Sequence, residues 1–158
     1  MKKRFFAAAM ILAASAMSVN AVDYPGGTQT ATIDVSIAPS FTVSIPADTT
    51  VAFNAVETDF GKITLESARL EPNTSIFVTL RTDYSLSNAL DTKKQIPYSV
   101  TGNNGGEWFD VRGFNLELAN AGDSYDLKIN ITQEDWNAAF AGDYSDQVIF
   151  TVSYNGTV

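Results

Sequence analysis

Closely spaced acidic side chains are the first candidates for chemistry in this sequence. Two carboxyl groups about 5–9.5 Å apart can serve as the acid and the base of a glycosidase. The pairs are Glu107 with Asp110, Glu134 with Asp135, and Asp143 with Asp146. Each pair lies in or beside a segment typical of a turn, where Asp and Glu are common for conformational reasons. We therefore expect no catalytic residue and no enzymatic activity.

Two loops rich in oxygen donors are candidates for calcium binding. They are GNNGGEWFD at 102–110 and AGDYSD at 141–146. Neither has the D-x-[DN]-x-[DN]-G spacing of a calcium loop, and turn chemistry explains both. The chain contains no Cys and no His, which excludes disulfides, Cys/His zinc sites, and Cys–His or Ser–His–Asp nucleophiles. We expect neither a metal nor a cofactor.

Aromatic rings are the remaining candidates for ligand binding, namely Trp108, Trp136 and Tyr144. Trp108 follows a glycine-rich turn, so its ring could lie at a loop tip and stack on a sugar. Packing across a hairpin is the competing interpretation. Trp136 and Tyr144 are large amphipathic rings that can cover the end of a sandwich while their polar tips reach a partner.

The N-terminus predicts a secretory signal peptide. Three basic residues at positions 2–4 precede an apolar run over 5–14, and small residues follow, with Val19 and Ala21 at the −3 and −1 positions of a cleavage site. The run is shorter than the ~20 residues of a membrane helix. We expect cleavage after Ala21, no membrane insertion afterwards, and a secreted or cell-surface location.

The charge of the chain limits its partners. The net charge is −8, with 10 basic and 18 acidic residues. The predicted leader contains three of the basic residues and no acidic one, so the mature chain would carry −11. Nucleic acids and anionic lipids bind clustered Lys and Arg, so we expect neither as a partner.

Apolar and polar residues alternate along most of the chain, which predicts β-strands. Examples are TATIDVSIA, with Ile33, Val35 and Ile37 on one face, and SIFVTLR at 75–81. About eight to ten short strands separated by turns every ~8–12 residues are typical of an all-β sandwich. We expect a single antiparallel immunoglobulin-like sandwich over 31–158, after a signal peptide over 1–21 and a flexible segment over 22–30.

The final strand carries Val148, Phe150 and Val152 on one face. Burial of these three side chains would contribute about 5–9 kcal/mol, at about 1.5–3 kcal/mol each. We expect this strand to close a sheet within its own molecule. The alternative is that a terminal strand completes a neighbouring subunit.

Three stretches, FTVSIPADTTVAF, GKITLESARLEPNTSIFVTL and EDWNAAFAGDYSDQVIFTVSY, carry a family resemblance. Together they resemble small exported Ig-like β-sandwich surface proteins of Gram-positive, Clostridia-type bacteria. The recurrent ending of that group is matched by Trp136, Ala139, Gly142, Tyr144, Ile149, Phe150, Thr151 and Val152. The layout is also similar to the WxL cell-wall-binding domain, although Phe150-Thr151-Val152 stands in place of W-x-L. The resemblance implies an adhesion-type, cell-wall-associated role.

These observations predict a non-enzymatic, secreted or surface-associated β-sandwich with a structural or binding role. The candidate partners are a cell-wall polysaccharide and another surface protein. One alternative is a fimbrial or pilus-like subunit that self-assembles when TQTATIDVSIA is donated to a neighbour as a β-strand. A second alternative is a carbohydrate-binding module.

Overall fold

Short antiparallel strands build this protein, as the alternating sequence predicts. The computed structural model describes residues 5–8, 30 and 32–155. Within this part of the chain one short helix accompanies twelve strands. Their bounds are β1 Phe5–Ala8, β2 Ser40–Ser44, β3 Glu57–Arg69, β4 Ser75–Arg81, β5 Ser85–Asn88, β6 Gln95–Pro97, β7 Ser99–Asn103, β8 Phe109–Asp110, β9 Leu116–Leu118, β10 Ser124–Asn130, α1 Gln133–Ala138, β11 Tyr144–Ser145 and β12 Ile149–Asn155.

The strands form one large sheet and two small ones. The large sheet has the order β1-β2-β3-β10-β7-β8, and the small sheets have the orders β12-β4-β9 and β11-β5-β6. Every strand pair is antiparallel. The predicted all-β sandwich with antiparallel sheets is confirmed. The number of strands exceeds the expectation because several are only two or three residues long and because β1 lies within the predicted leader.

The core lies between the large sheet and the small sheets. Ile63 and Leu65 of β3 and Leu127 of β10 are fully buried on one side, and Ile76 and Val78 of β4 are fully buried on the other. Each strand contributes every second residue, because side chains of a strand alternate between its two faces. The two-residue period of the sequence therefore identifies the core directly.

A β-bulge in β3 brings an additional ring into this core. Leu127 of β10 pairs with Gly61, whereas the next residue, Lys128, pairs with Asp59, so Phe60 is the extra residue. Gly61 has a φ of 104°, which disfavours any side chain, and its N–H donates to Asp59 Oδ1 at 2.9 Å. The bulge lets Phe60 point inward along with Ile63, although the two residues would otherwise face opposite sides.

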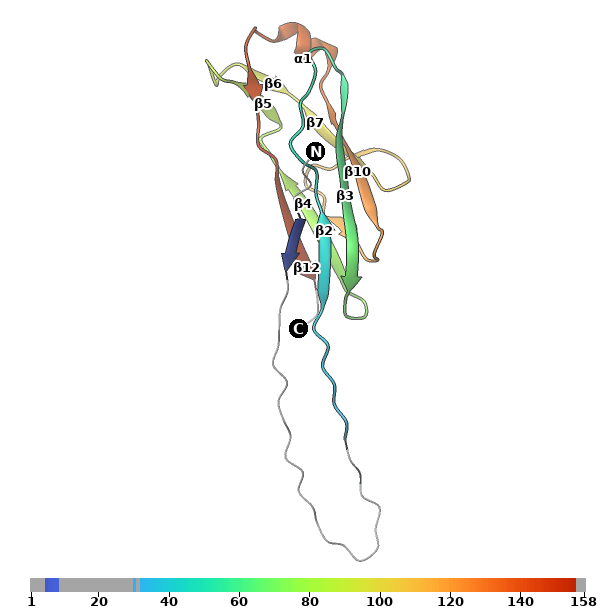
Figure 1. Cartoon of the computed structure of the whole chain (residues 1–158). Helices are drawn as coiled ribbons and strands as arrows, with labels where there is room; N and C mark the ends of the chain where they lie inside the picture. Colours follow the sequence, from blue (N-terminus) through green and yellow to red (C-terminus); the bar gives the residue numbers. More distant parts are fainter. Residues whose placement is uncertain (1–4, 9–29, 31, 156–158) are drawn as a thin grey trace, which may run out of the picture.

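The single helix begins directly after a capping threonine. Thr132 is the N-cap of α1, and its Oγ1 accepts a hydrogen bond from Asp135 N at 3.1 Å. The helix lies at one end of the sandwich, together with β5 and β6 (Figure 1). It is too short to span a membrane, and no other helix occurs in the described part of the chain.

The first described residues of the predicted domain, which starts at 31, lie outside the sheets. Residues 32–39 take no part in any sheet, and the first strand after the predicted leader is β2, which starts at Ser40. The expectation that Ile33, Val35 and Ile37 lie in a strand of the fold is therefore wrong for the described residues, among which no strand pairs with them. The cleavage position at Ala21 and the segment 22–29 fall outside the described residues.

Candidate functional site

Trp108, the first predicted ligand-binding residue, lies in the loop between β7 and β8. Its side chain is 41% exposed, and the Nζ atom of Lys128 lies 4.3 Å from the centroid of its ring. The same Nζ atom forms an ion pair with Glu57 Oε1 at 2.7 Å. The lysine covers the ring and accounts for its position by a cation–π contact.

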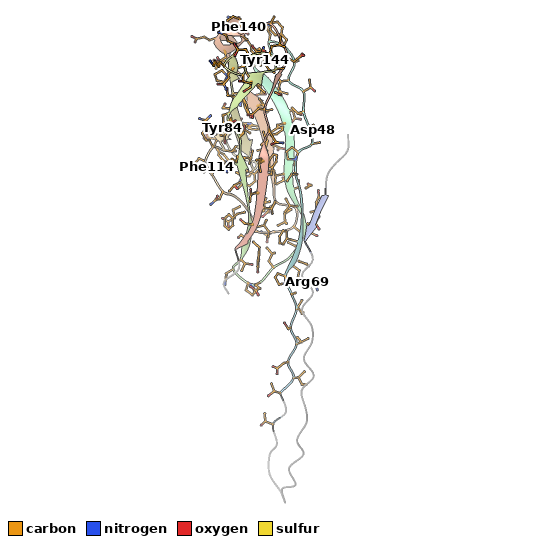
Figure 2. All side chains as sticks on the ribbon, turned by 90° about the vertical axis from the view of Figure 1, so that its left-hand side faces the viewer. Asp48, Arg69, Tyr84, Phe114, Phe140 and Tyr144 are labelled. Atoms are coloured by element: carbon orange, nitrogen blue, oxygen red, sulfur yellow. The ribbon has the colours of Figure 1, made fainter. Side chains whose placement is uncertain are left out.

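Trp136 and Tyr144 lie in other elements and have partners of their own. Trp136, in α1, is buried, and its Nε1 donates to the carbonyl oxygen of Ala55 at 3.0 Å. Tyr144, in β11, is half-buried, and its hydroxyl donates to the carbonyl oxygen of Phe140 at 3.0 Å. Both rings cover the α1 end of the sandwich, where Figure 2 labels Phe140 and Tyr144. No ring contact or hydrogen bond in the described residues joins Trp108 to either of them.

One residue of each predicted carboxylate pair has a structural hydrogen-bond partner. Asp110 Oδ1 accepts a hydrogen bond from Arg112 N at 2.8 Å in a turn, and Asp135 accepts one from the Thr132 hydroxyl at 2.6 Å in the helix cap. In the described ranges no three acidic side chains gather closely enough to hold a metal ion. The geometry thus gives these carboxylates the turn and cap roles that their sequence context favours.

Asp146 belongs to a hydrogen-bonded cluster with Thr82 and Tyr98. Its Oδ2 accepts from the Thr82 hydroxyl at 2.5 Å and from the Tyr98 hydroxyl at 2.8 Å. Burial of Tyr98 raises its pKa above the usual value of a tyrosine; the bond with Thr82 lowers it, and Asp146 raises it further. The cluster fixes the segment that leads into β12 against the chain between β4 and β7.

The segment of residues 32–39, which we name the N-terminal extension, is the most unusual surface of the molecule. Ile33, Val35 and Ile37 are 95%, 86% and 63% exposed. Figures 1 and 2 show the extension running away from the sandwich along the line of β2, with its side chains free of the body. Large aliphatic side chains so exposed and so regularly spaced are unusual for a segment without a partner.

The final strand pairs within its own molecule, as expected, but at the edge of its sheet. β12 pairs with β4 along its whole length, from Ile149 opposite Arg81 to Asn155 opposite Ser75, and it is an edge strand of its sheet. Val148, Phe150 and Val152 are only partly buried. The alternation of this segment is the same for an edge strand as for a central one, so the sequence could not distinguish them.

β2 of the large sheet and β12, an edge strand of a small sheet, come together at this side of the molecule. We name this side the β2–β12 edge. The ring of Phe41 in β2 stacks on Tyr154 of β12 at 6.4 Å between centroids, and Phe60 of β3 meets Phe150 of β12 at 6.0 Å. Beyond these rings, β12 has no strand partner on its outer side in the described structure. Backbone groups without a partner along an edge are a template for pairing with another chain.

A surface hollow lies between the β3–β4 turn and the loop after β9. Its volume is about 560 Å³, and Glu71, Thr74, Glu117 and Asn120 are among its lining residues. Glu71 accepts a hydrogen bond from the Tyr154 hydroxyl at 3.1 Å, and Glu117 accepts one from Ser75 Oγ at 2.6 Å. The hollow is polar, and its acidic groups already have hydrogen-bond donors.

Sequence reasoning identified the N-terminal extension as a strand that could be donated, but it missed the β2–β12 edge. A signal was available in part, because Phe41 and Tyr154 place aromatic rings near the two ends of the sandwich sequence. Their proximity depends on topology, which alternation alone does not specify.

Comparisons with known proteins place the chain in no family. No family model matches it, and no curated protein matches it. One solved structure with some likeness is described as "Chaperone-tip adhesin complex is vital for synergistic activation of CFA/I fimbriae biogenesis". The identity is 13% and the TM-score is 0.47, over 83% of this chain and 41% of that one. The chain therefore spans less than half the length of the protein that it matches.

Proposed function

We propose that this chain is an exported, non-enzymatic structural subunit of the cell surface, and that it joins another protein chain by donating its N-terminal extension as a β-strand. Its location rests on the leader-like N-terminus and the acidic composition. Its mode of association rests on the extension.

The exposure of Ile33, Val35 and Ile37 is the observation that carries the proposal. Burial of such side chains yields about 1.5–3 kcal/mol each, so a partner that covers all three would gain roughly 5–9 kcal/mol before the cost of ordering the segment. Their two-residue spacing puts all three on one face of an extended chain. In strand addition, main-chain hydrogen bonds supply affinity and pockets for alternate side chains supply specificity.

The extension does not fold back onto the sandwich of its own molecule (Figure 1). The extension continues directly into β2 at Ser40 and leaves the body along the line of that strand (Figure 1). To pair with β2 it would have to reverse direction within a few residues of Pro39, which has no N–H to donate to a sheet. Because the described residues provide no strand partner for the extension, we propose that the partner is another chain.

The proposal is tested with material from the cell surface of the exporting organism. Extracts are run in SDS without heating and after boiling, and the chain is detected by immunoblotting. We expect species larger than the monomer that resist SDS and collapse on boiling, because donated strands dissociate slowly. Val35→Asp places a charge on the apolar face of the extension and should reduce these species at least tenfold.

Ser36→Asp is the matched control, since it introduces the same charge at the neighbouring position on the opposite face. It should leave the large species nearly unchanged. If the wild-type chain is only monomeric in the extracts, or if both variants behave alike, strand donation by the extension is rejected.

A further inference from the structure

The β2 edge already carries a short strand in this structure. β1, Phe5–Ala8, pairs antiparallel with β2, with Phe6 opposite Val43 and Ala8 opposite Phe41. β1 lies within the predicted leader, so cleavage after Ala21 would remove it and leave the backbone of β2 without a partner on that side. An edge that accepts four residues from a distant part of the chain has the register and access that a donated strand requires.

The other side of the same opening is formed by β12. This strand is seven residues long and pairs only with β4 in the described structure. Phe150 and Val152 turn toward the core but remain partly exposed. An added strand could therefore pair with backbone groups at the edge and cover these apolar side chains at the same time.

The opposite edge of the same small sheet is already complete. Leu116 and Leu118 of β9 are 1% and 0% exposed, although β9 is also an edge strand. An apolar strand would gain no further burial from these two side chains. Partial burial thus distinguishes the β2–β12 edge from the β9 edge as the acceptor.

We infer that the β2–β12 edge receives the N-terminal extension of a second copy of this chain. The inference rests on the proposed function and adds the acceptor and the identity of the partner. Once β1 is removed with the predicted leader, every copy would carry both an unoccupied edge and the donor, and the donor extends away from the sandwich of its own molecule (Figure 1). A donor and an acceptor on different surfaces make a head-to-tail contact, which extends into a fibre unless the rotation closes a ring.

Residue spacing agrees with this assignment. The extension presents Ile33, Val35 and Ile37 at two-residue intervals, and the edge presents Phe150 and Val152 at the same interval. Side chains on one face of neighbouring strands lie about 4.5–5.5 Å apart when they are directly opposite, so both sets can interdigitate.

A disulfide cross-link between two copies tests the inference directly. The natural chain has no cysteine, so any disulfide must join the introduced residues. One mature copy carries Ser36→Cys on the outward face of the extension. The second copy carries Thr151→Cys or Ser153→Cys, both exposed positions of β12. We expect an oxidised heterodimer with at least one of these acceptors.

Glu117→Cys, an exposed position of β9 on the other edge of the same sheet, is the matched control acceptor. It should give at least tenfold less heterodimer. If SDS-resistant species of the natural chain are present but the cross-link forms only at Glu117, or at neither strand, the acceptor assignment is overturned while strand donation stands. If those species are absent, both proposals fail.

A peptide of residues 30–39 gives a second measurement that needs no cysteine. Added in excess to the intact mature chain, it should occupy the acceptor, shorten the oligomers and raise the melting temperature. The same peptide with Val35→Asp should do neither. Equal effects of the two peptides, or no effect of the natural one, would contradict the assignment.

Discussion

The two lateral sides of this sandwich differ in how completely they are built. At the β9 side, Leu116 and Leu118 are buried, although β9 has a strand on one side only. At the β2–β12 side, Phe41 and Val152 are only partly buried, and β12 has a strand on one side. The same alternating sequence pattern supplies both sides, so the difference arises from topology rather than from composition.

This difference predicts that different side chains determine the stability of one chain and its association with another. A fully buried side chain contributes its whole transfer free energy to the folding of one chain. A partly buried side chain contributes some of that free energy on folding and the remainder when another strand covers it. We therefore expect the first side to determine the free energy of unfolding and the second to determine association.

The largest expected effect comes from one substitution made at a fully buried position and at a partly buried one. Val78 and Val152 are directly opposite each other in the β4–β12 register, but Val78 is fully buried. Val78→Ala should lower the free energy of unfolding by about 2–3 kcal/mol, because it removes two methyl groups and leaves a cavity. Val152→Ala should cost about 1 kcal/mol or less in the isolated chain. Urea denaturation measures both.

The two substitutions should rank in the opposite order when assembly is measured instead of the free energy of unfolding. Val152→Ala should weaken the SDS-resistant species more than Val78→Ala does, once both proteins are studied under conditions where they are folded. If the two substitutions cost the same free energy of unfolding, the β2–β12 edge is no less complete than the rest of the sandwich.

We expect an intermediate effect at high pH from the hydrogen-bonded cluster of Thr82, Tyr98 and Asp146. This cluster fixes the segment that precedes β12. Because the pKa of Tyr98 is raised in the folded protein, the unfolded chain ionises first above its ordinary value of about 10. The stabilising contribution is therefore complete below pH 10 and is lost as the pH rises further. One such group adds a slope of up to about 1.4 kcal/mol per pH unit.

Tyr98→Phe should remove this slope. At neutral pH it should lower the free energy of unfolding by about 1 kcal/mol, because one hydrogen bond to Asp146 is lost. Urea unfolding curves recorded at pH 8, 10 and 11 compare the two proteins. Parallel pH profiles would show that Tyr98 ionises equally in the folded and unfolded states.

The smallest effect is expected at the helix, which lies away from the extension. Thr132→Ala removes the N-cap acceptor of α1 and should lower the free energy of unfolding by about 1 kcal/mol. Thr132→Ser keeps a hydroxyl and should cost less. Neither variant should change the proportion of SDS-resistant species; a marked loss with both would mean that the helix end takes part in assembly.

The sequence predicted the elements better than their arrangement. Burial in β4 follows its alternation residue by residue, and the cap at Thr132 follows from local chemistry, because both depend on neighbours in the chain. Phe60 faces inward only through a bulge, which the alternation of β3 does not indicate. The edge position of β12 depends on which strands lie beside it, and strands that are central or at an edge share one pattern.

The sequence predicted the N-terminal extension as a donor strand but not the β2–β12 edge as its acceptor. The edge, like the position of β12, depends on the arrangement of the strands. Ile33, Val35 and Ile37 were recognisable from spacing, although a strand of the fold and a donated strand look alike in sequence. The acceptor half requires Phe41 and Tyr154 to meet across more than a hundred residues. For Trp136 the sequence favours packing over binding, and its Nε1 donates to the carbonyl oxygen of Ala55.

The turn before β11 has a consequence for recognising relatives of this protein. Gly142 has a φ of 143°, and a Cβ atom there would lie 2.5 Å from Asn88 Nδ2. Asn88 is buried, and its Oδ1 accepts hydrogen bonds from Leu90 N at 2.9 Å and Asp91 N at 3.3 Å. Neither residue can change without disturbing the other. A glycine and an asparagine found together at these positions would identify distant homologues even where the overall sequence identity is too low to detect them.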